Sequence, residues 1–312
     1  MSLKGEKFMK YILEAQNLEK KYGHVKVIND LNLHVPQGAI YGLIGKNGAG
    51  KTTLIRILCG LQKETFGTYS IYGILNNDNK IIEARKRIGG VIESPSICSD
   101  MTAEDNLKEQ YKVIGIPSFE NIPELLNLVG LGNVGKKKAK DFSLGMKQRL
   151  GIAVALVGNP DIIILDEPLN GLDPEGIIDV RELILKLNKE KNITFLISSH
   201  YLDELFKVAT CYGILDKGTI IKEIDKNEIE QKFQKKIQIC VSDVKECVKY
   251  LEENKLHYKI ISDNIIDIYD EINISEFVIA LSQRNCKINK FQEKEETLEN
   301  FYLNLIGGGN ND

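Results

Sequence analysis

A glycine-rich loop at residues 45–52 constrains the fold of this 312-residue chain more than any other feature. Its sequence, GKNGAGKT, matches the pattern G-x-x-x-x-G-K-[ST] and follows a β-like run at 40–44. In such a loop the glycines let successive backbone N–H groups point at a phosphate, and the following helix adds its positive N-terminal end. A plain glycine-rich turn is the alternative, but chance rarely places Lys and Thr at this spacing behind a buried strand.

The loop predicts a set of residues that binds the phosphates of a nucleotide. We expect Lys51 to bridge phosphate oxygens and Thr52 to offer its hydroxyl to Mg²⁺. The predicted phosphate-binding residues are Gly45, Asn47, Gly48, Gly50, Lys51, Thr52 and Thr53. The loop by itself leaves kinases, GTPases and ATPases open as classes of enzyme.

Two later strands narrow the choice. The apolar run at 162–165 ends in Asp166 and Glu167, and the run at 194–198 ends close to His200. Carboxyl ends of strands in open α/β sheets are where ligands bind. We therefore expect Asp166 to hold Mg²⁺ through water, Glu167 to act as general base, and His200 to contact the γ-phosphate and hold the geometry of Glu167 and water. Each strand-end residue alone could be structural, but the three together favour catalysis.

The rest of the chain predicts two domains. From residue 11 to about 223, short β-rich runs alternate with longer helical stretches, which is typical of a parallel α/β sheet. After a charged stretch at 226–236 the pattern becomes strand, helix, strand, strand, helix, strand. That order indicates a small α+β domain of the ferredoxin-like kind. We place the larger domain at 10–225, the smaller domain and a tail at 226–312, and a leader at 1–9.

Charge and apolar runs argue against nucleic-acid and membrane roles for the chain itself. Lys and Arg total 41 against 44 Asp and Glu, so the formal charge of -3 provides no broad basic surface. The longest apolar runs are far shorter than a membrane-spanning helix, and no secretory signal is visible. The six cysteines form no C-x-x-C pair, which argues against a zinc site.

Residues 142–149, FSLGMKQR, resemble the L-S-G-G-Q signature of the ABC transporter ATP-binding family, with Ser143 and Gly145 kept. In that family the signature binds the phosphate of ATP held by the other subunit of a dimer. Residues 170–174, NGLDP, look like the family's D-loop, so Asp173 is expected at the dimer seam. Tyr22 matches the position that stacks on adenine. The resemblance covers residues 11–223 and implies a P-loop ATPase with a helical subdomain at about 95–157.

One position departs from the family pattern. The family's Q-loop glutamine is replaced by Glu93, which we expect to contact ATP and Mg²⁺ in its place. This glutamate, the form of the signature and the small C-terminal domain resemble the branch that serves bacitracin transport and lantibiotic immunity.

The resemblance implies an ATP-hydrolysing transporter subunit. It would work as a homo- or heterodimer with integral membrane permease subunits and would power export, with antimicrobial peptides as the implied substrate class, from the cytoplasmic face of the membrane. ATP and Mg²⁺ are the implied cofactors, and no nucleic acid is expected as a partner. The alternative is a soluble ABC ATPase that acts on nucleic acid or ribosomes. Such proteins usually carry two ATPase domains or long coiled-coil insertions, which this chain lacks.

Overall fold

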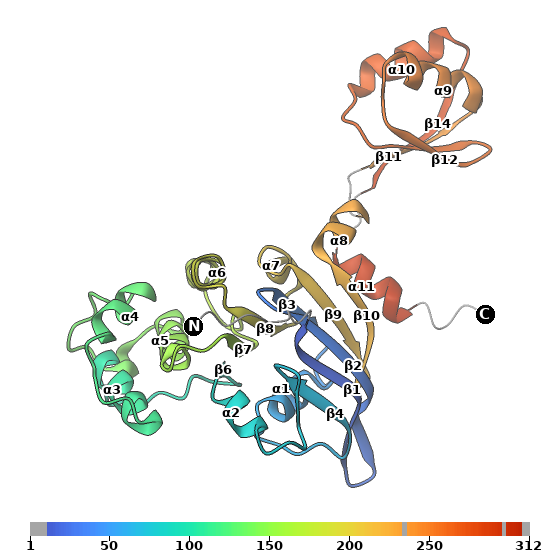
Figure 1. Ribbon diagram of the computed structural model, residues 1–312. Helices are drawn as coiled ribbons and strands as arrows, with labels where there is room; N and C mark the ends of the chain where they lie inside the picture. The colour runs from blue at the N-terminus through green and yellow to red at the C-terminus, as the bar shows by residue number, and fades with distance from the viewer. Residues whose placement is uncertain (1–10, 233–235, 295–297, 308–312) are drawn as a thin grey trace, which may run out of the picture. The chain divides into compact units, whose positions relative to one another are not determined.

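The computed structural model describes residues 11–232, 236–294 and 298–307. The chain divides into two compact units, Met1–Lys226 and Asn227–Asp312, which are described separately (Figure 1). The predicted leader at 1–9 and the end of the predicted tail, 308–312, lie outside the described residues. Among the described residues, no helix has both the length and the apolar character needed to cross a bilayer.

A six-stranded sheet forms the centre of the first unit. Its strand order is β10-β9-β3-β8-β7-β6, and all neighbours are parallel except the edge pair β9 and β10. The strands are β3 (Ile40–Ile44), β6 (Ile88–Val91), β7 (Ile162–Asp166), β8 (Thr194–Ser199), β9 (Cys211–Asp216) and β10 (Thr219–Asp225). Every residue of β3, β7 and β8 is buried, as expected of apolar strands covered on both faces. The carboxyl ends of these three neighbours meet at one edge of the sheet.

A second sheet of the first unit is antiparallel, so the prediction of a parallel sheet throughout 11–223 is wrong for its strands. It has the order β2-β1-β4-β5. Its strands are β1 (Tyr11–Tyr22), β2 (Val25–Pro36), β4 (Phe66–Ile71) and β5 (Ile74–Leu75). Only Gly23 and His24 separate β1 from β2, and two residues can join antiparallel strands but cannot make the long crossover that parallel strands need. The length of the turn therefore makes β1 and β2 antiparallel. The alternation of apolar and polar residues along the two strands does not indicate their relative direction.

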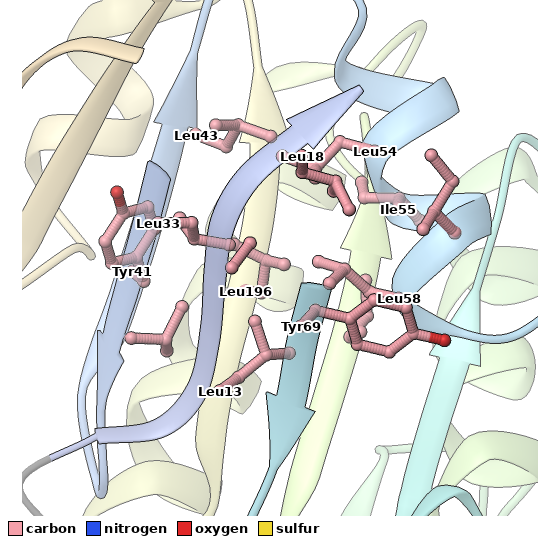
Figure 2. Close-up of a cluster of buried hydrophobic side chains, with 14 of the residues drawn as sticks. Leu13, Leu18, Leu33, Tyr41, Leu43, Leu54, Ile55, Leu58, Tyr69 and Leu196 are labelled. Atoms are coloured by element: carbon pink, nitrogen blue, oxygen red, sulfur yellow. The ribbon is translucent and has the colours of Figure 1, made fainter. Parts of the chain in front are cut away.

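The main core of the first unit is shared by the two sheets and helix α1 (Lys51–Leu58) (Figure 2). Leu13 of β1, Leu33 of β2 and Leu196 of β8 are each fully buried in it. Helix α1 contributes Leu54 and its apolar neighbours, which anchors the helix firmly. The start of α1, where Lys51 lies, is therefore held in a fixed place beside the sheet edge.

The remaining helices of the first unit follow the chain between and after the strands. They are α2 (Ile81–Arg85), α3 (Ala103–Ile114), α4 (Ile122–Leu128), the 3₁₀ turn η1 (Ala139–Asp141), α5 (Leu144–Leu156), α6 (Pro174–Lys191) and α7 (Leu202–Phe206). Helix α8 (Lys226–Lys232) begins at the last residue of the first unit, and its other residues belong to the second unit. Helices α3, α4 and α5 pack on one another, and α5 also packs on β6 and α6 (Figure 1). Helix α5 starts at Leu144, directly after Ser143, whose hydroxyl caps it by accepting from the N–H of Met146.

The second unit has the ferredoxin-like fold that the sequence predicts. Its sheet has the order β12-β13-β11-β14, and all neighbouring strands are antiparallel. Its elements are β11 (Lys236–Val241), α9 (Val244–Glu253), β12 (Tyr258–Ser262), β13 (Ile265–Ile268), α10 (Ile274–Gln283), β14 (Ile288–Lys294) and α11 (Leu298–Gly307). Its core joins Ile239 and Ile266 of the sheet to Leu251 and Phe277 of α9 and α10. The predicted fold class, a P-loop α/β ATPase with a helical subdomain and a small α+β domain, is confirmed.

A polar cluster ties β10 to the centre of the first unit. The hydroxyl of Tyr41, which is 1% exposed, donates to Glu223 Oε1 at 2.6 Å. Glu223 Oε2 also lies 2.7 Å from His34 Nδ1. Burial, and then the nearby Glu223 carboxylate, raises the pKa of Tyr41 well above its usual value, so the phenol stays protonated and donates at neutral pH.

Removing this hydroxyl is expected to destabilise the first unit. Hydrogen bonds to charged groups contribute about 1.5–3 kcal/mol, so Tyr41→Phe should lower the free energy of unfolding by about that amount. Urea denaturation measures the change. Tyr212→Phe is the matched control, because Tyr212 is equally buried but donates to the neutral carbonyl of Ala209 at 3.1 Å. A larger loss for Tyr212→Phe would contradict the explanation by charge.

Candidate active site

The predicted phosphate loop joins β3 to α1 and surrounds a pocket of about 240 Å³. Gly48 and Gly50 have φ angles of 83° and 111°, in the left-handed region that favours glycine. A Cβ added to Gly50 would also lie 2.8 Å from Ile28 Cδ1. No side chain caps the start of α1, so its first N–H groups remain for a ligand. The pocket is lined by Val27, Lys46, Asn47, Gly48, Gly50, Lys51, Thr52, Thr53 and Glu167.

Lys51 lines the pocket and is 5% exposed. Its ammonium group donates to the carbonyl of Gly45 at 2.5 Å and lies 3.1 Å from Glu167 Oε1. Both of these partners are oxygen atoms, and a phosphate would offer the ammonium group oxygen atoms as well. The geometry therefore suits an ammonium group that exchanges protein oxygens for those of a phosphate.

Asp166 is the last residue of β7 and is 3% exposed. Its Oδ2 accepts a hydrogen bond from the Thr52 hydroxyl at 2.8 Å, so two of the three predicted metal ligands are in contact. Among the described residues, no cluster of three or more His, Cys, Asp or Glu side chains could hold a metal alone. Mg²⁺ usually binds through one or two carboxylates together with water and substrate phosphate. The Thr52 and Asp166 oxygens fit Mg²⁺ that arrives with a nucleotide.

Glu167 connects the phosphate loop to His200. Its backbone is left-handed, with a φ of 51°, which is uncommon for a residue other than glycine. One carboxylate oxygen faces Lys51, and the other lies 2.7 Å from Nδ1 of His200, the first residue after β8. The structure thus brings together the five residues that the three strand ends were predicted to deliver: Lys51, Thr52, Asp166, Glu167 and His200.

The signature and D-loop motifs lie next to each other in the chain's own structure. Ser143 caps α5, accepting from the N–H of Met146 at 3.2 Å, and Asp173 caps α6, accepting from the N–H of Gly176 at 3.1 Å. A Cβ added to Gly145 would lie 3.4 Å from the Cα of Gly176. None of these residues is among those that line the phosphate-loop pocket.

Tyr22 and Glu93 are not among the residues that line the phosphate-loop pocket. Tyr22 ends β1, is 43% exposed, and has Lys20 Nζ 5.2 Å from its ring centroid. Glu93 has a φ of 63°, and its carboxylate lies 2.6 Å from Arg56 Nη2 on α1. Within the described residues, the structure pairs Glu93 with Arg56 and not with Thr52 or Asp166.

Two residues with contacts to the site were not predicted from the sequence. Arg56 pairs with Glu93, and the buried Ser198 bonds to both Asp166 and the backbone of Glu167. Ser198 follows an apolar run, as many strand residues do, and only its register opposite Asp166 distinguishes it. That register is a property of the folded sheet.

Comparison with known proteins identifies the family. Residues 28–170 match the profile of the ABC transporter family. The bacitracin transport ATP-binding protein BcrA of Bacillus licheniformis is 41% identical over 306 residues, which cover 96% of this chain and 99% of the relative. The chain belongs to the ABC transporter family. BcrA of Enterococcus faecalis is 39% identical over 96% of this chain and 98% of its own length.

Other relatives of this ABC protein agree in sequence and fold. The lantibiotic transport ATP-binding protein SrtF of Streptococcus pyogenes is 43% identical over 72% of this chain and 97% of its own length. The dimeric structure of the ATP-binding cassette MJ0796 bound to ADP and Pi is similar with a TM-score of 0.61 and 26% identity, covering 69% of this chain and 98% of that one. The predicted resemblance to the bacitracin and lantibiotic branch is confirmed.

Proposed function

We propose that this chain hydrolyses ATP to power an ABC transporter that exports antimicrobial peptides through a separate membrane subunit. The observation that carries the proposal is the contact network in which Glu167 bridges Lys51 and His200, beside the pair of Thr52 and Asp166. The names of the relatives, which are bacitracin and lantibiotic transport ATP-binding proteins, support a peptide antibiotic as the exported substrate. They also favour transport over action on nucleic acid or ribosomes.

The residues of the phosphate loop and of the neighbouring strand ends have complementary roles in the proposed reaction. The N–H groups of the loop at 45–50 and of the start of α1 bind the phosphates, and Lys51 neutralises their charge. Glu167 accepts the proton of the attacking water, while His200 orients the Glu167 carboxylate and contacts the γ-phosphate. Thr52 and Asp166 would hold Mg²⁺, which offsets negative charge on the phosphates. We further propose that Tyr22, which is half-exposed, stacks on adenine.

A second ATPase subunit completes the proposed site. Ser143 is exposed at the N-terminus of α5 and lies outside the phosphate-loop pocket of its own chain, so it is available to the phosphate of another subunit. Gly145 and Asp173 lie beside it and would share the seam between the subunits. The dimeric cassette structure supports this arrangement.

We assign residues 10–225 to the ATP-binding domain, with its helical subdomain at about 95–157, and residues 226–312 to an accessory domain. The two compact units support this division. The BcrA relatives match 96% of this chain, which supports an accessory domain shared with that branch. The chain would bind the cytoplasmic face of the membrane through its permease partner.

Isolation of the chain from membranes tests the transport function. A tagged chain expressed in its own host should co-purify from detergent-solubilised membranes with a protein that spans the membrane several times. Recovery of the chain with ribosomes or nucleic acid and without a membrane protein would support the alternative instead.

Glu93 is proposed to contact the nucleotide site, where the family has glutamine. A carboxylate adds a full negative charge near anionic phosphates, whereas an amide offers a neutral carbonyl. Glu93→Gln should therefore lower the Mg²⁺ concentration that gives half-maximal ATPase activity, by about two- to tenfold for a charge interaction near 1 kcal/mol. A Mg²⁺ titration of ATPase activity measures the change.

Glu83→Gln is the control for this titration. Glu83 also pairs with a basic side chain on the surface, Lys86 at 2.8 Å, but Lys86 follows α2, whereas the partner of Glu93, Arg56, belongs to α1, the helix that follows the phosphate loop. The proposal for Glu93 is wrong if Glu93→Gln shifts the titration no more than Glu83→Gln does, because Glu93 would then be only a surface partner of Arg56.

A further inference from the structure

We propose that Ser198 is a positioning residue that holds the metal-binding and general-base residues in register through one buried hydroxyl. Ser198 lies on β8, directly opposite Asp166 of β7, and is 0% exposed. Its Oγ donates to Asp166 Oδ1 at 2.5 Å and accepts from the N–H of Glu167 at 2.9 Å. The inference rests on the proposed roles of Asp166 and Glu167.

The first effect of Ser198 is on the Asp166 carboxylate. Thr52 donates to Oδ2 of Asp166, and Ser198 donates to Oδ1, so both oxygens have a fixed partner. Because Asp166 is buried, an oxygen that lost its donor could not turn to water without moving the carboxylate. Ser198 therefore fixes the direction in which Asp166 presents its oxygens to the phosphate loop.

The second effect is on the backbone of Glu167. This residue is in the left-handed region, where a residue other than glycine stays only if its surroundings hold it there. Its N–H is directed at Ser198, with Oγ at 2.9 Å and the carbonyl oxygen at 3.2 Å. The turn that sends the Glu167 carboxylate toward Lys51 and His200 is thus held by the neighbouring strand.

The other two buried hydroxyl residues of β8 have different partners, so a hydrogen bond to a carboxylate is particular to Ser198. Thr194, at the opposite end of β8, accepts from the backbone N–H of Gly38 at 2.8 Å. Ser199 accepts from the backbone N–H of Tyr201 at 2.9 Å. Both bond to backbone groups, whereas Ser198 bonds to a carboxylate as well.

A positioning residue should affect the chemical step more than nucleotide binding. Partners that orient metal and acid-base ligands typically contribute ten- to hundredfold to activity. We expect Ser198→Ala to lower kcat by about ten- to hundredfold. The affinity for ATP should change by less than about threefold, since Lys51 and the loop glycines still bind the phosphates.

The experiment compares Ser198→Ala with Thr194→Val in the full chain. Thr194→Val removes a buried hydroxyl from the same strand at the end away from the site, so it controls for loss of stability. Steady-state kinetics give kcat and KM, and calorimetry in a Glu167→Gln background gives ATP affinity. Hydrogen exchange of the Glu167 amide, measured without nucleotide, should be faster in Ser198→Ala and unchanged in Thr194→Val.

The outcomes separate this inference from the proposed function. If the wild type hydrolyses ATP, Glu167→Gln does not, and Ser198→Ala keeps the wild-type kcat, the inference about Ser198 fails alone. An equal loss of kcat in Thr194→Val would also overturn it, because the effect would then follow stability. If Ser198→Ala does not fold, Ser198→Cys takes its place, because a thiol is a weak donor of similar size. A wild type without ATPase activity would instead contradict the proposed function.

Discussion

Glu167→Gln is expected to abolish ATP turnover while ATP binding is kept. Glutamine has the size of glutamate but cannot accept a proton from water, and loss of a general base typically costs about 10²–10⁴-fold in rate. The carboxylate of Glu167 faces both Lys51 and His200, so the substitution also removes the charge that ties these two side chains together. Lys51 is then freer to bind phosphate, which is why affinity should not fall.

An assay of phosphate release, together with size-exclusion chromatography, tests this prediction. With ATP present, the variant should accumulate as an ATP-bound dimer, because the bound nucleotide is not consumed. Glu190→Gln, which changes an exposed glutamate of α6, should behave as the wild type. Hydrolysis by Glu167→Gln at the wild-type rate would show that another group is the base.

A mixture of Lys51→Ala and Ser143→Arg chains is expected to recover function that neither variant has alone. Lys51→Ala should weaken ATP binding by about ten- to hundredfold, since a buried ammonium group that binds phosphate is lost. Ser143→Arg places a long side chain at the N-terminus of α5, where the phosphate of the other subunit is proposed to bind. In a mixed dimer one site receives both substitutions and the other receives neither.

The expected recovery is quantitative. Random pairing of equal amounts gives about half mixed dimers, each with one intact site of two, so about a quarter of the wild-type number of sites should return. ATPase activity and ATP-driven dimerisation of the mixture, compared with each variant at the same total concentration, measure it. Mixing that adds nothing would mean that Ser143 does not act on the nucleotide of another subunit.

The centre of the site could be predicted from the sequence because its parts are local. The phosphate loop requires particular residue types over eight consecutive positions, and it lies between an apolar strand and a helix whose apolar face enters the core. Asp166 and Glu167 directly follow a fully buried strand. Such features depend on neighbouring residues, so a motif and its flanking pattern are enough to indicate them.

Features that depend on pairing between distant segments could not be predicted from the sequence pattern. The contact between Ser198 and Asp166 needs the register of β7 and β8, which are 32 residues apart at these positions. The pairing of Arg56 with Glu93 joins α1 to a loop after β6. In the antiparallel sheet, β1 pairs with β4, which follows the phosphate loop and α1 in the chain.

The central claim is that ATP hydrolysis by this chain powers export. A transport assay with the reconstituted transporter tests this claim most directly. The chain and the membrane protein that co-purifies with it would be placed in lipid vesicles with the ATPase subunits outside, and uptake of a peptide antibiotic would be measured. The account predicts uptake that needs ATP, occurs with the wild-type chain and is absent with Glu167→Gln. Uptake that proceeds without ATP, or equally with Glu167→Gln, would contradict it.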